Sequence, residues 1–279
     1  MSFIEAIKYL ILGLVQGITE VLPISSSGHV ELMQEIVGVD ASEGLLFLVL
    51  VNTGSLITLM FVFRKQIVAI IKDFVLFVFN KETRDKTRPN FLFGVKLIIA
   101  SIPAAIIGLF FQDIFDNMLV EYGTLVSGIG LLFTGTVLIF INYNRFRSGY
   151  TDLNFIDCIW MGIAQAIALF PGISRSGMTA GTGIKRGVGV KTAIEFSFMM
   201  YIPASIGALL LQIYKGIKEG YAVPSVHHYY YYIIAFFSAV VATFISFKMV
   251  FHIFQRGRLN YFGFYCLAIG ILSIALFIV

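Results

Sequence analysis

Apolar residues follow one another along this chain in long stretches rather than in amphipathic stripes. Six stretches approach the ~20 residues that a helix needs to cross a hydrocarbon core ~30 Å thick. They occupy residues 44–63, 91–111, 121–142, 194–214, 229–251 and 261–279. None shows the alternation of apolar and polar residues over ~10 positions that is typical of barrel strands. The pattern predicts an all-α integral membrane protein with about six transmembrane helices.

Two further apolar regions, at residues 3–39 and 155–184, are interrupted by polar residues, prolines and glycines. Each has the pattern of an apolar helix, a polar break and a second, shorter helix. Irregular backbone at membrane depth must be buried in protein or line a wet cavity. We therefore expect two re-entrant helical hairpins in addition to the six spans.

The two broken regions resemble each other at a constant offset of 149 residues. Between residues 13–28 and 162–177, seven of sixteen positions are identical. The identical pairs are Gly13/Gly162, Gln16/Gln165, Ile18/Ile167, Ile24/Ile173, Ser25/Ser174, Ser27/Ser176 and Gly28/Gly177. The shared Ser-x-Ser-Gly core favours internal duplication over convergent composition. A single membrane domain is predicted, with repeat 1 at about residues 1–142 and repeat 2 at about 155–279.

The charged links between the spans predict the orientation in the membrane. Basic residues gather at residues 64–90, 143–154 and 252–260, whereas the link at 112–120 has Asp113 and Asp116 and no basic residue. By the positive-inside rule, the first three links are cytoplasmic and the last is external. An odd number of spans, three, separates the two broken regions, so they enter from opposite faces. This predicts an inverted-topology repeat whose polar breaks meet near the midplane.

The composition mainly excludes other classes of protein. Only 13% of residues are charged, against about 25% in soluble domains. The net charge of +4 comes from links between spans and does not indicate nucleic-acid binding. Cys158 and Cys266 both lie in apolar segments, so a disulfide framework is not expected.

The first break carries the residues best suited to chemistry. Gln16 and Glu20 are four residues apart and share one helix face. An ionisable residue at membrane depth is expensive, so Glu20 indicates function. The Ser25–Ser26–Ser27 turn then opens a helix, whose free N–H groups suit an anion such as phosphate. His29 follows within one turn and could move a proton near neutral pH.

The second break adds a fixed cation to the same kind of turn. Arg175 lies between Ser174 and Ser176, and its guanidinium fork matches phosphate oxygens. A structural role is the alternative for each residue alone, since serines in membrane helices often only bond the i−4 carbonyl. The coincidence of both breaks at matching repeat positions favours a phosphoester site instead.

These motifs resemble those of the undecaprenyl-diphosphate phosphatase family, also called the bacitracin-resistance proteins. That family has an (E/Q)-x-x-x-E motif running into L-P-x-S-S-[ST]-G-H, and a second motif, P-G-x-S-R-S-x-x-T. This sequence has QGITE at 16–20, LPISSSGH at 22–29 and PGISRSGMT at 171–179. It departs at residues 52–55, where NTGS replaces the Q-L-G-[SA] of many members. Gln16 leaves one carboxylate rather than two in the first motif.

The resemblance implies hydrolysis of undecaprenyl diphosphate to the monophosphate, which recycles the lipid carrier for cell-wall synthesis. It further implies an externally facing site in the plasma membrane, a divalent cation (Mg²⁺ or Ca²⁺, with Glu20 as candidate ligand) and a possible homodimer. The candidate catalytic residues are Glu20, Ser26, His29 and Arg175. The candidate substrate-binding residues are Gln16, Ser25, Ser27, Gly28, Ser174, Ser176 and Thr179.

Two points stay open at the level of sequence. Either Ser26 or His29 could supply or position the nucleophile. A polyprenyl-phosphate flippase is the alternative function, because inverted repeats with broken helices are typical of secondary transporters. A non-catalytic scaffold would leave the intramembrane Glu20 and Arg175 unexplained.

Overall fold

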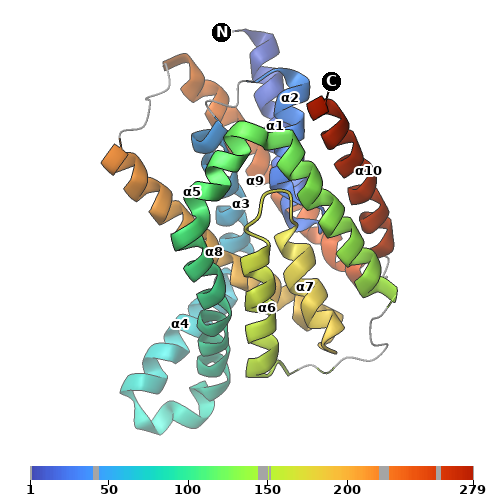
Figure 1. Cartoon of the computed structure of the whole chain (residues 1–279). Coiled ribbons are helices and arrows are strands. Elements are labelled where there is room, and N and C mark those ends of the chain that lie inside the picture. The colour runs from blue at the N-terminus through green and yellow to red at the C-terminus, as the bar shows by residue number, and fades with distance from the viewer. Residues whose placement is uncertain are drawn as a thin grey trace.

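The computed structural model describes residues 2–39, 44–143, 150, 152–219, 226–255 and 259–278, and their regular secondary structure is helical. The helices are α1 (Phe3–Val21), α2 (Ser26–Val37), α3 (Gly44–Val62), α4 (Arg64–Phe79), the short 3₁₀ turn η2 (Lys81–Thr83), α5 (Arg84–Tyr143), α6 (Phe155–Ile167), α7 (Arg175–Lys185), α8 (Val190–Glu219), α9 (Val226–Gln255) and α10 (Leu259–Ile278). Figure 1 shows them packed as one bundle, with both termini at the same end.

Four of these helices are long and apolar enough to cross a membrane, within the described residues. A fifth crossing is possible if α3 and α4, which are bent by 71° at their junction, form one broken span. The prediction of an all-α membrane protein is confirmed, but the expected six spans are not six separate helices. The stretches at residues 91–111 and 121–142 both belong to α5.

The 60-residue helix α5 is divided by a kink at Tyr122, whose φ of −135° and ψ of 31° are not helical. Its two arms run in opposite directions on either side of this kink (Figure 1). A continuous helix of that length would measure about 90 Å at 1.5 Å per residue, far more than one bilayer. Each arm therefore corresponds to one of the two predicted stretches.

Both broken regions form the expected helix–break–helix hairpins, α1 with α2 and α6 with α7. The hairpins approach each other from opposite ends of the bundle (Figure 1). Their tips touch: the Ser176 hydroxyl donates to the Leu22 carbonyl at 2.9 Å, and the Gly172 N–H donates to the Ser27 hydroxyl at 3.4 Å. The breaks therefore meet inside the protein, while the internal duplication itself stays a prediction.

Close backbone contact fixes α1 against α9. A Cβ added to Gly13 would lie 2.2 Å from the Ala235 carbonyl oxygen, and one added to Gly17 would lie 2.5 Å from the Ala239 carbonyl oxygen. Small residues four positions apart are the usual means of bringing two membrane helices together, because apolar side chains gain little from leaving lipid. This contact fixes the position of α1, which carries Glu20 near its end.

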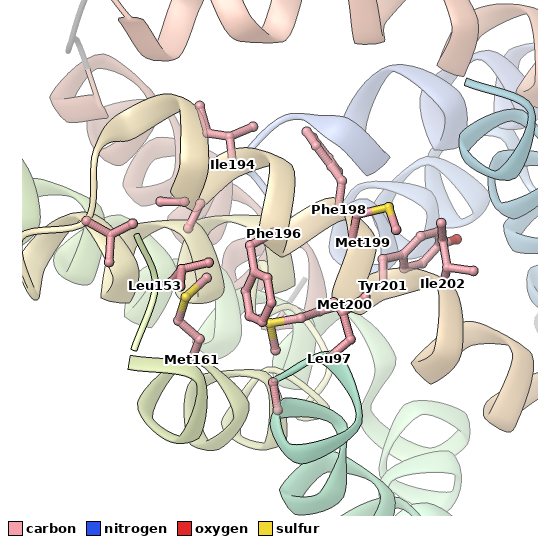
Figure 2. Packing of buried hydrophobic residues seen from close by; sticks show 14 of the residues in the cluster. Leu97, Leu153, Met161, Ile194, Phe196, Phe198, Met199, Met200, Tyr201 and Ile202 are labelled. Atoms are coloured by element: carbon pink, nitrogen blue, oxygen red, sulfur yellow. The ribbon is translucent and has the colours of Figure 1, made fainter. Parts of the chain in front are cut away.

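A buried apolar cluster joins α5, α6 and α8. Figure 2 shows Phe196 and Met200 of α8 packed among Leu97 of α5 and Met161 of α6. Phe196 and Met200 are fully buried. Because these side chains fix the rotation of α8, they also fix the direction of Tyr201, the next residue along.

Candidate active site

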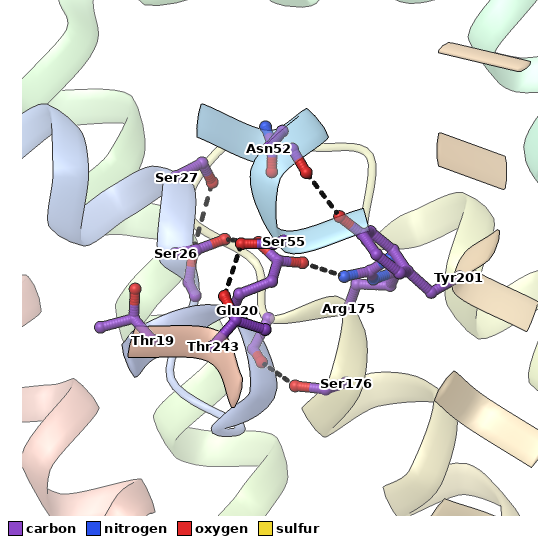
Figure 3. Close-up of polar contacts among 12 residues, drawn as sticks. Thr19, Glu20, Ser26, Ser27, Asn52, Ser55, Arg175, Ser176, Tyr201 and Thr243 are labelled. Atoms are coloured by element: carbon purple, nitrogen blue, oxygen red, sulfur yellow. Dashed lines mark hydrogen bonds and ion pairs between the residues drawn. The ribbon is translucent and has the colours of Figure 1, made fainter. Parts of the chain in front are cut away.

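Glu20 lies at the centre of the site, near the end of α1, and is 5% exposed. Its Oε2 accepts hydrogen bonds from Gln16 Nε2 and from the Ser26 hydroxyl, both at 2.7 Å. Its Oε1 forms an ion pair with Arg175 (Figure 3). A buried carboxylate is tolerated when it is paired and hydrogen-bonded in this way. The shared helix face predicted for Gln16 and Glu20 is present.

Arg175 is the first residue of α7 and connects the two breaks through its ion pair with Glu20. Its guanidinium carbon lies 3.5 Å from the centre of the Tyr201 ring, a cation–π contact. The Tyr201 hydroxyl donates to the backbone carbonyl of Asn52 at 3.3 Å (Figure 3). The cation is thus held by an anion on one side and an aromatic face on the other.

Matching serines cap the two short helices that begin at the site. Ser25 precedes α2 and its hydroxyl accepts from the Gly28 N–H at 3.3 Å. Ser174 precedes α7 and its hydroxyl accepts from the Gly177 N–H at 3.2 Å. The positive ends of both helices therefore lie at the tips of the hairpins, where they favour an anion. Gly28 contributes backbone to this cap rather than a side chain.

The paired hydroxyls repeat in the same pattern at both breaks. Ser25 and Ser27 hydroxyls lie 3.3 Å apart, as do those of Ser174 and Ser176. The capping residues themselves differ in backbone: Ser25 has a φ of +68°, whereas Ser174 has a φ of −73°. Among the described residues, Ser25 is the one residue other than glycine with a positive φ. Such strain persists where the surrounding structure requires it, often at functional sites.

A cavity of about 300 Å³ opens onto these groups. Its lining includes Glu20, Ser26 and Arg175, together with the serines of both breaks at positions 25, 27, 174 and 176. It also includes Gln112 and Asp116 of α5 and Gln212 of α8, whose amide donates to Asp116 at 3.4 Å. The structure therefore brings most of the sequence-predicted residues together around one space.

Four sequence-predicted residues, Gln16, Gly28, His29 and Thr179, do not line this cavity in the described part of the chain. Gln16 lies behind Glu20 and bonds to it. Thr179 is fully buried, and its hydroxyl donates to the Arg175 carbonyl at 2.8 Å and pairs with Ser197 of α8. This contact joins α7 to α8 and leaves no free hydroxyl for a substrate.

His29 does not line the cavity and contacts α10 instead. Its Nδ1 is 2.8 Å from the Ser25 carbonyl oxygen and its Nε2 is 3.0 Å from the Tyr265 hydroxyl. The His29 and Tyr265 rings stack with their centres 5.5 Å apart. A carbonyl oxygen only accepts, so the proton lies on Nδ1 and Nε2 accepts from Tyr265. The assignment of His29 to catalysis stays a prediction.

Among the residues of the cavity wall that sequence reasoning missed, Asn52 of α3 and Tyr201 of α8 lie next to the Glu20–Arg175 pair. Both come from otherwise apolar spans without a helix break, so no local pattern pointed to a site. The departure from the family at residues 52–55 was the one available signal. Tyr201 has no such signal, because aromatic residues are frequent throughout the chain.

A divalent cation finds few protein ligands at this site. No group of three or more His, Cys, Asp or Glu side chains gathers anywhere in the described residues. Glu20 is the carboxylate at the breaks, and both of its oxygens already accept hydrogen bonds. Mg²⁺ commonly takes one or two carboxylates and completes its shell with water and substrate phosphates. The donor set fits a cation held mainly by phosphate oxygens.

The fold defines a polytopic α-helical membrane protein, in which buried polar and charged side chains gather where two broken helices meet. A family model for "Bacitracin resistance protein BacA" matches residues 9–272. The chain belongs to this family.

The sequence is similar to those of related proteins over nearly its whole length. The chain is 40% identical to "Undecaprenyl-diphosphatase 2" of Bacillus thuringiensis, over 98% of both proteins. It is 39% identical to an undecaprenyl-diphosphatase of Oceanobacillus iheyensis, over 97% of this chain and 96% of the relative. It is 35% identical to one of Carboxydothermus hydrogenoformans, over 98% and 97% respectively.

Proposed function

We propose that this protein is an undecaprenyl-diphosphate phosphatase, which hydrolyses the lipid diphosphate to the monophosphate and phosphate. The product is the carrier lipid needed again for cell-wall synthesis. The observation that carries the proposal is the Glu20–Ser26–Arg175 cluster, placed between two helix N-termini in a chain of the BacA family. The flippase alternative has no support from the family or from the relatives.

Substrate binding uses groups that stabilise negative charge. In this proposal, Arg175 and the N–H groups at the starts of α2 and α7 hold the oxygens of the terminal phosphoryl group. Charge on these oxygens changes as phosphoryl transfer proceeds, and donors fixed in advance stabilise it without reorganisation. Seryl hydroxyls at positions 25, 27, 174 and 176 complete the polar wall.

Ser26 is the nucleophile in this proposal, because its hydroxyl already donates to Glu20 and both line the cavity. Glu20 takes the proton while Ser26 Oγ attacks the terminal phosphorus. The bond from this phosphorus to the bridging oxygen breaks, and undecaprenyl monophosphate leaves. Glu20 passes its proton to the departing undecaprenyl monophosphate and then takes a proton from the water that attacks the phosphoserine. This proton returns to Ser26 Oγ as the bond from the phosphorus to Ser26 Oγ breaks and phosphate leaves.

A Mg²⁺ or Ca²⁺ ion would be held by the diphosphate oxygens, with Glu20 as a candidate protein ligand. When bound, it neutralises phosphate charge. We further propose that the cavity faces the external side, because Asp116 in its wall belongs to the link predicted to be external. A homodimer remains part of the proposal on the family resemblance alone.

The test is phosphate release from undecaprenyl diphosphate by the purified protein in detergent, with and without Mg²⁺ or Ca²⁺. Arg175→Ala should lose turnover while the protein remains folded. Arg64→Ala is the matched control, because Arg64 donates to the Phe61 carbonyl at the exposed start of α4. No release by folded wild-type protein with any cation would contradict the proposal.

A further inference from the structure

Asn52 is a polar residue on α3 whose part in the site the sequence motifs do not explain. It lines the cavity and has an exposed side chain, although the neighbouring Val51 is fully buried. Figure 3 shows it next to the Glu20–Arg175 pair. Its exposure is therefore exposure to the cavity in which the diphosphate is proposed to bind.

Hydrogen-bond chemistry fixes which way the amide of Gln16 points. An ionised carboxylate can only accept, so the Gln16 atom 2.7 Å from Glu20 Oε2 is the nitrogen, Nε2. The same nitrogen is 2.9 Å from Asn52 Oδ1. Both N–H groups of Gln16 are thereby used, one on Glu20 and one on Asn52.

The orientation of Asn52 follows from that of Gln16. Because Gln16 presents only a donor, the Asn52 atom facing it must be the carbonyl oxygen, and the NH₂ group lies on the other branch of the amide. This NH₂ makes no hydrogen bond within the described part of the chain. Two N–H donors are thus left on a residue of the cavity wall, beside Ser26 and Arg175.

We propose that Asn52 is a substrate-binding residue whose NH₂ group donates to a phosphate oxygen of the lipid diphosphate, while its carbonyl holds Gln16 against Glu20. The inference rests on the proposed function. It assigns the amide two separable tasks, donation to the substrate and acceptance from Gln16. Phosphate oxygens only accept, and a donor to a charged group is worth more than one between neutral groups.

The two tasks can be separated by substitution. Asn52→Asp keeps an acceptor for Gln16 but removes the NH₂ and adds a negative charge facing the substrate. Asn52→Leu has a similar size and removes both tasks. If the NH₂ binds phosphate, kcat/KM should fall about 10- to 100-fold in Asn52→Leu and at least as far in Asn52→Asp, as expected for one hydrogen bond to a charged group.

The relative kcat/KM values of the variants decide between substrate binding by Asn52 and a role in holding Gln16 only. Asn52→Asp with at least half of the wild-type kcat/KM would overturn the proposal and leave Asn52 with a role in holding Gln16 only. Near-normal kcat/KM in Asn52→Leu would overturn it as well. Asn52→Gln, which carries the amide found in many family members, should recover at least part of the activity, with the loss seen mainly in KM.

Three controls distinguish a failure of this inference from a failure of the proposed function and from misfolding of the variants. Thr136→Val is the matched control, since the Thr136 hydroxyl donates to the Leu132 carbonyl of its own helix at 2.9 Å and Thr136 does not line the cavity. Each variant is compared with wild type by its thermal unfolding midpoint in detergent. Phosphate release by the wild-type protein in the same assay shows whether the activity exists, independently of Asn52.

Discussion

At the scale of single residues, the site depends on one buried carboxylate that several donors share. Glu20 accepts from Gln16 and Ser26 and pairs with Arg175, so its charge is compensated before any substrate arrives. Arg175 must serve both Glu20 and the proposed phosphate. The two anions therefore compete for one guanidinium.

This competition predicts opposite effects of Glu20→Gln on binding and on turnover. Loss of the carboxylate frees Arg175, so inorganic phosphate should bind more tightly, by about 10-fold if one charged hydrogen bond is gained. Turnover should fall at least 100-fold, because Ser26 loses its proton acceptor. Isothermal titration with phosphate and the release assay measure the two effects. Glu121→Gln, at an exposed position, is the control; weaker phosphate binding in Glu20→Gln would contradict the competition.

The Tyr265 hydroxyl bonds to His29, which does not line the cavity, and this contact gives a test of the role of His29. If His29 transfers protons during turnover, it must leave Tyr265. Tyr265→Phe should then leave kcat unchanged or raise it up to about threefold, although the lost hydrogen bond reduces stability by about 1 kcal/mol. Under the same condition, His29→Ala should abolish turnover. Equal losses in both variants would instead assign His29 a structural role together with Tyr265.

The sequence identified these residues to different degrees. The four-residue spacing of Gln16 and Glu20 was enough to place both on one face, because helical geometry fixes that relation. The spacing from Ser26 to His29 did not reveal that His29 lies outside the cavity lining, because its partner Tyr265 is 236 residues further on. Asn52 was missed for the same reason, since its partner is on another helix.

At the scale of elements, the breaks are rigid because their ends are capped and their neighbours approach closely. The strained φ of +68° at Ser25 is a consequence of the α1–α2 turn. It predicts that Ser25→Gly and Ser25→Ala differ in stability. Glycine relieves the strain and loses only a few tenths of a kcal/mol as a cap, whereas alanine keeps the strain and loses about 1 kcal/mol. A glycine variant less stable than the alanine variant in thermal unfolding would contradict this.

The α1–α9 contact predicts a large effect from a single methyl group. In Gly13→Ala, the new Cβ would lie 2.0 Å from the Ser238 hydroxyl and 2.2 Å from the Ala235 carbonyl, so the helices must separate. Overpacking of this kind costs about 1–3 kcal/mol. Gly207→Ala is the matched control, because nothing lies within 4 Å of its added Cβ. Thermal unfolding in detergent should show a lower midpoint for Gly13→Ala alone, and equal midpoints would refute the close contact.

Elements were predicted well where proline occurs together with polar residues in a break, and less well at the kink of α5. Pro23 and Pro171 lie in the two breaks, and both hairpins were expected from them. The kink that divides α5 falls at Tyr122, beside Gly123, and an isolated glycine in an apolar stretch does not by itself indicate a break. Hydropathy placed both arms of α5 correctly but could not show that one helix carries them.

At the scale of the whole molecule, the meeting of the two breaks followed from counting spans. An odd number of crossings between the hairpins places their open ends on opposite faces, and the contacts of Ser176 with Leu22 and of Gly172 with Ser27 join the tips. The number of spans could not predict the cavity between the tips, because residues of α3, α5 and α8 also line it. Their side-chain directions depend on long-range packing.

The remaining question at this scale is which face of the membrane the cavity serves, and the fold makes this measurable. The kink of α5 lies at the same end of the bundle as both termini, and α4 with the start of α5 lies at the other end (Figure 1). Glu121 beside the kink and Lys86 near the start of α5 are both exposed. The native cysteines, Cys158 and Cys266, are fully buried and should not react.

In intact cells, a membrane-impermeant maleimide should therefore label Glu121→Cys and leave Lys86→Cys unlabelled until the membrane is permeabilised. The physical reason is the charge asymmetry, since the link with Lys86 is rich in basic residues and the link before Glu121 is not. Both variants should retain phosphate release, which excludes misinsertion. Labelling of Lys86→Cys alone would reverse the orientation, and the phosphatase would then act on lipid at the cytoplasmic face.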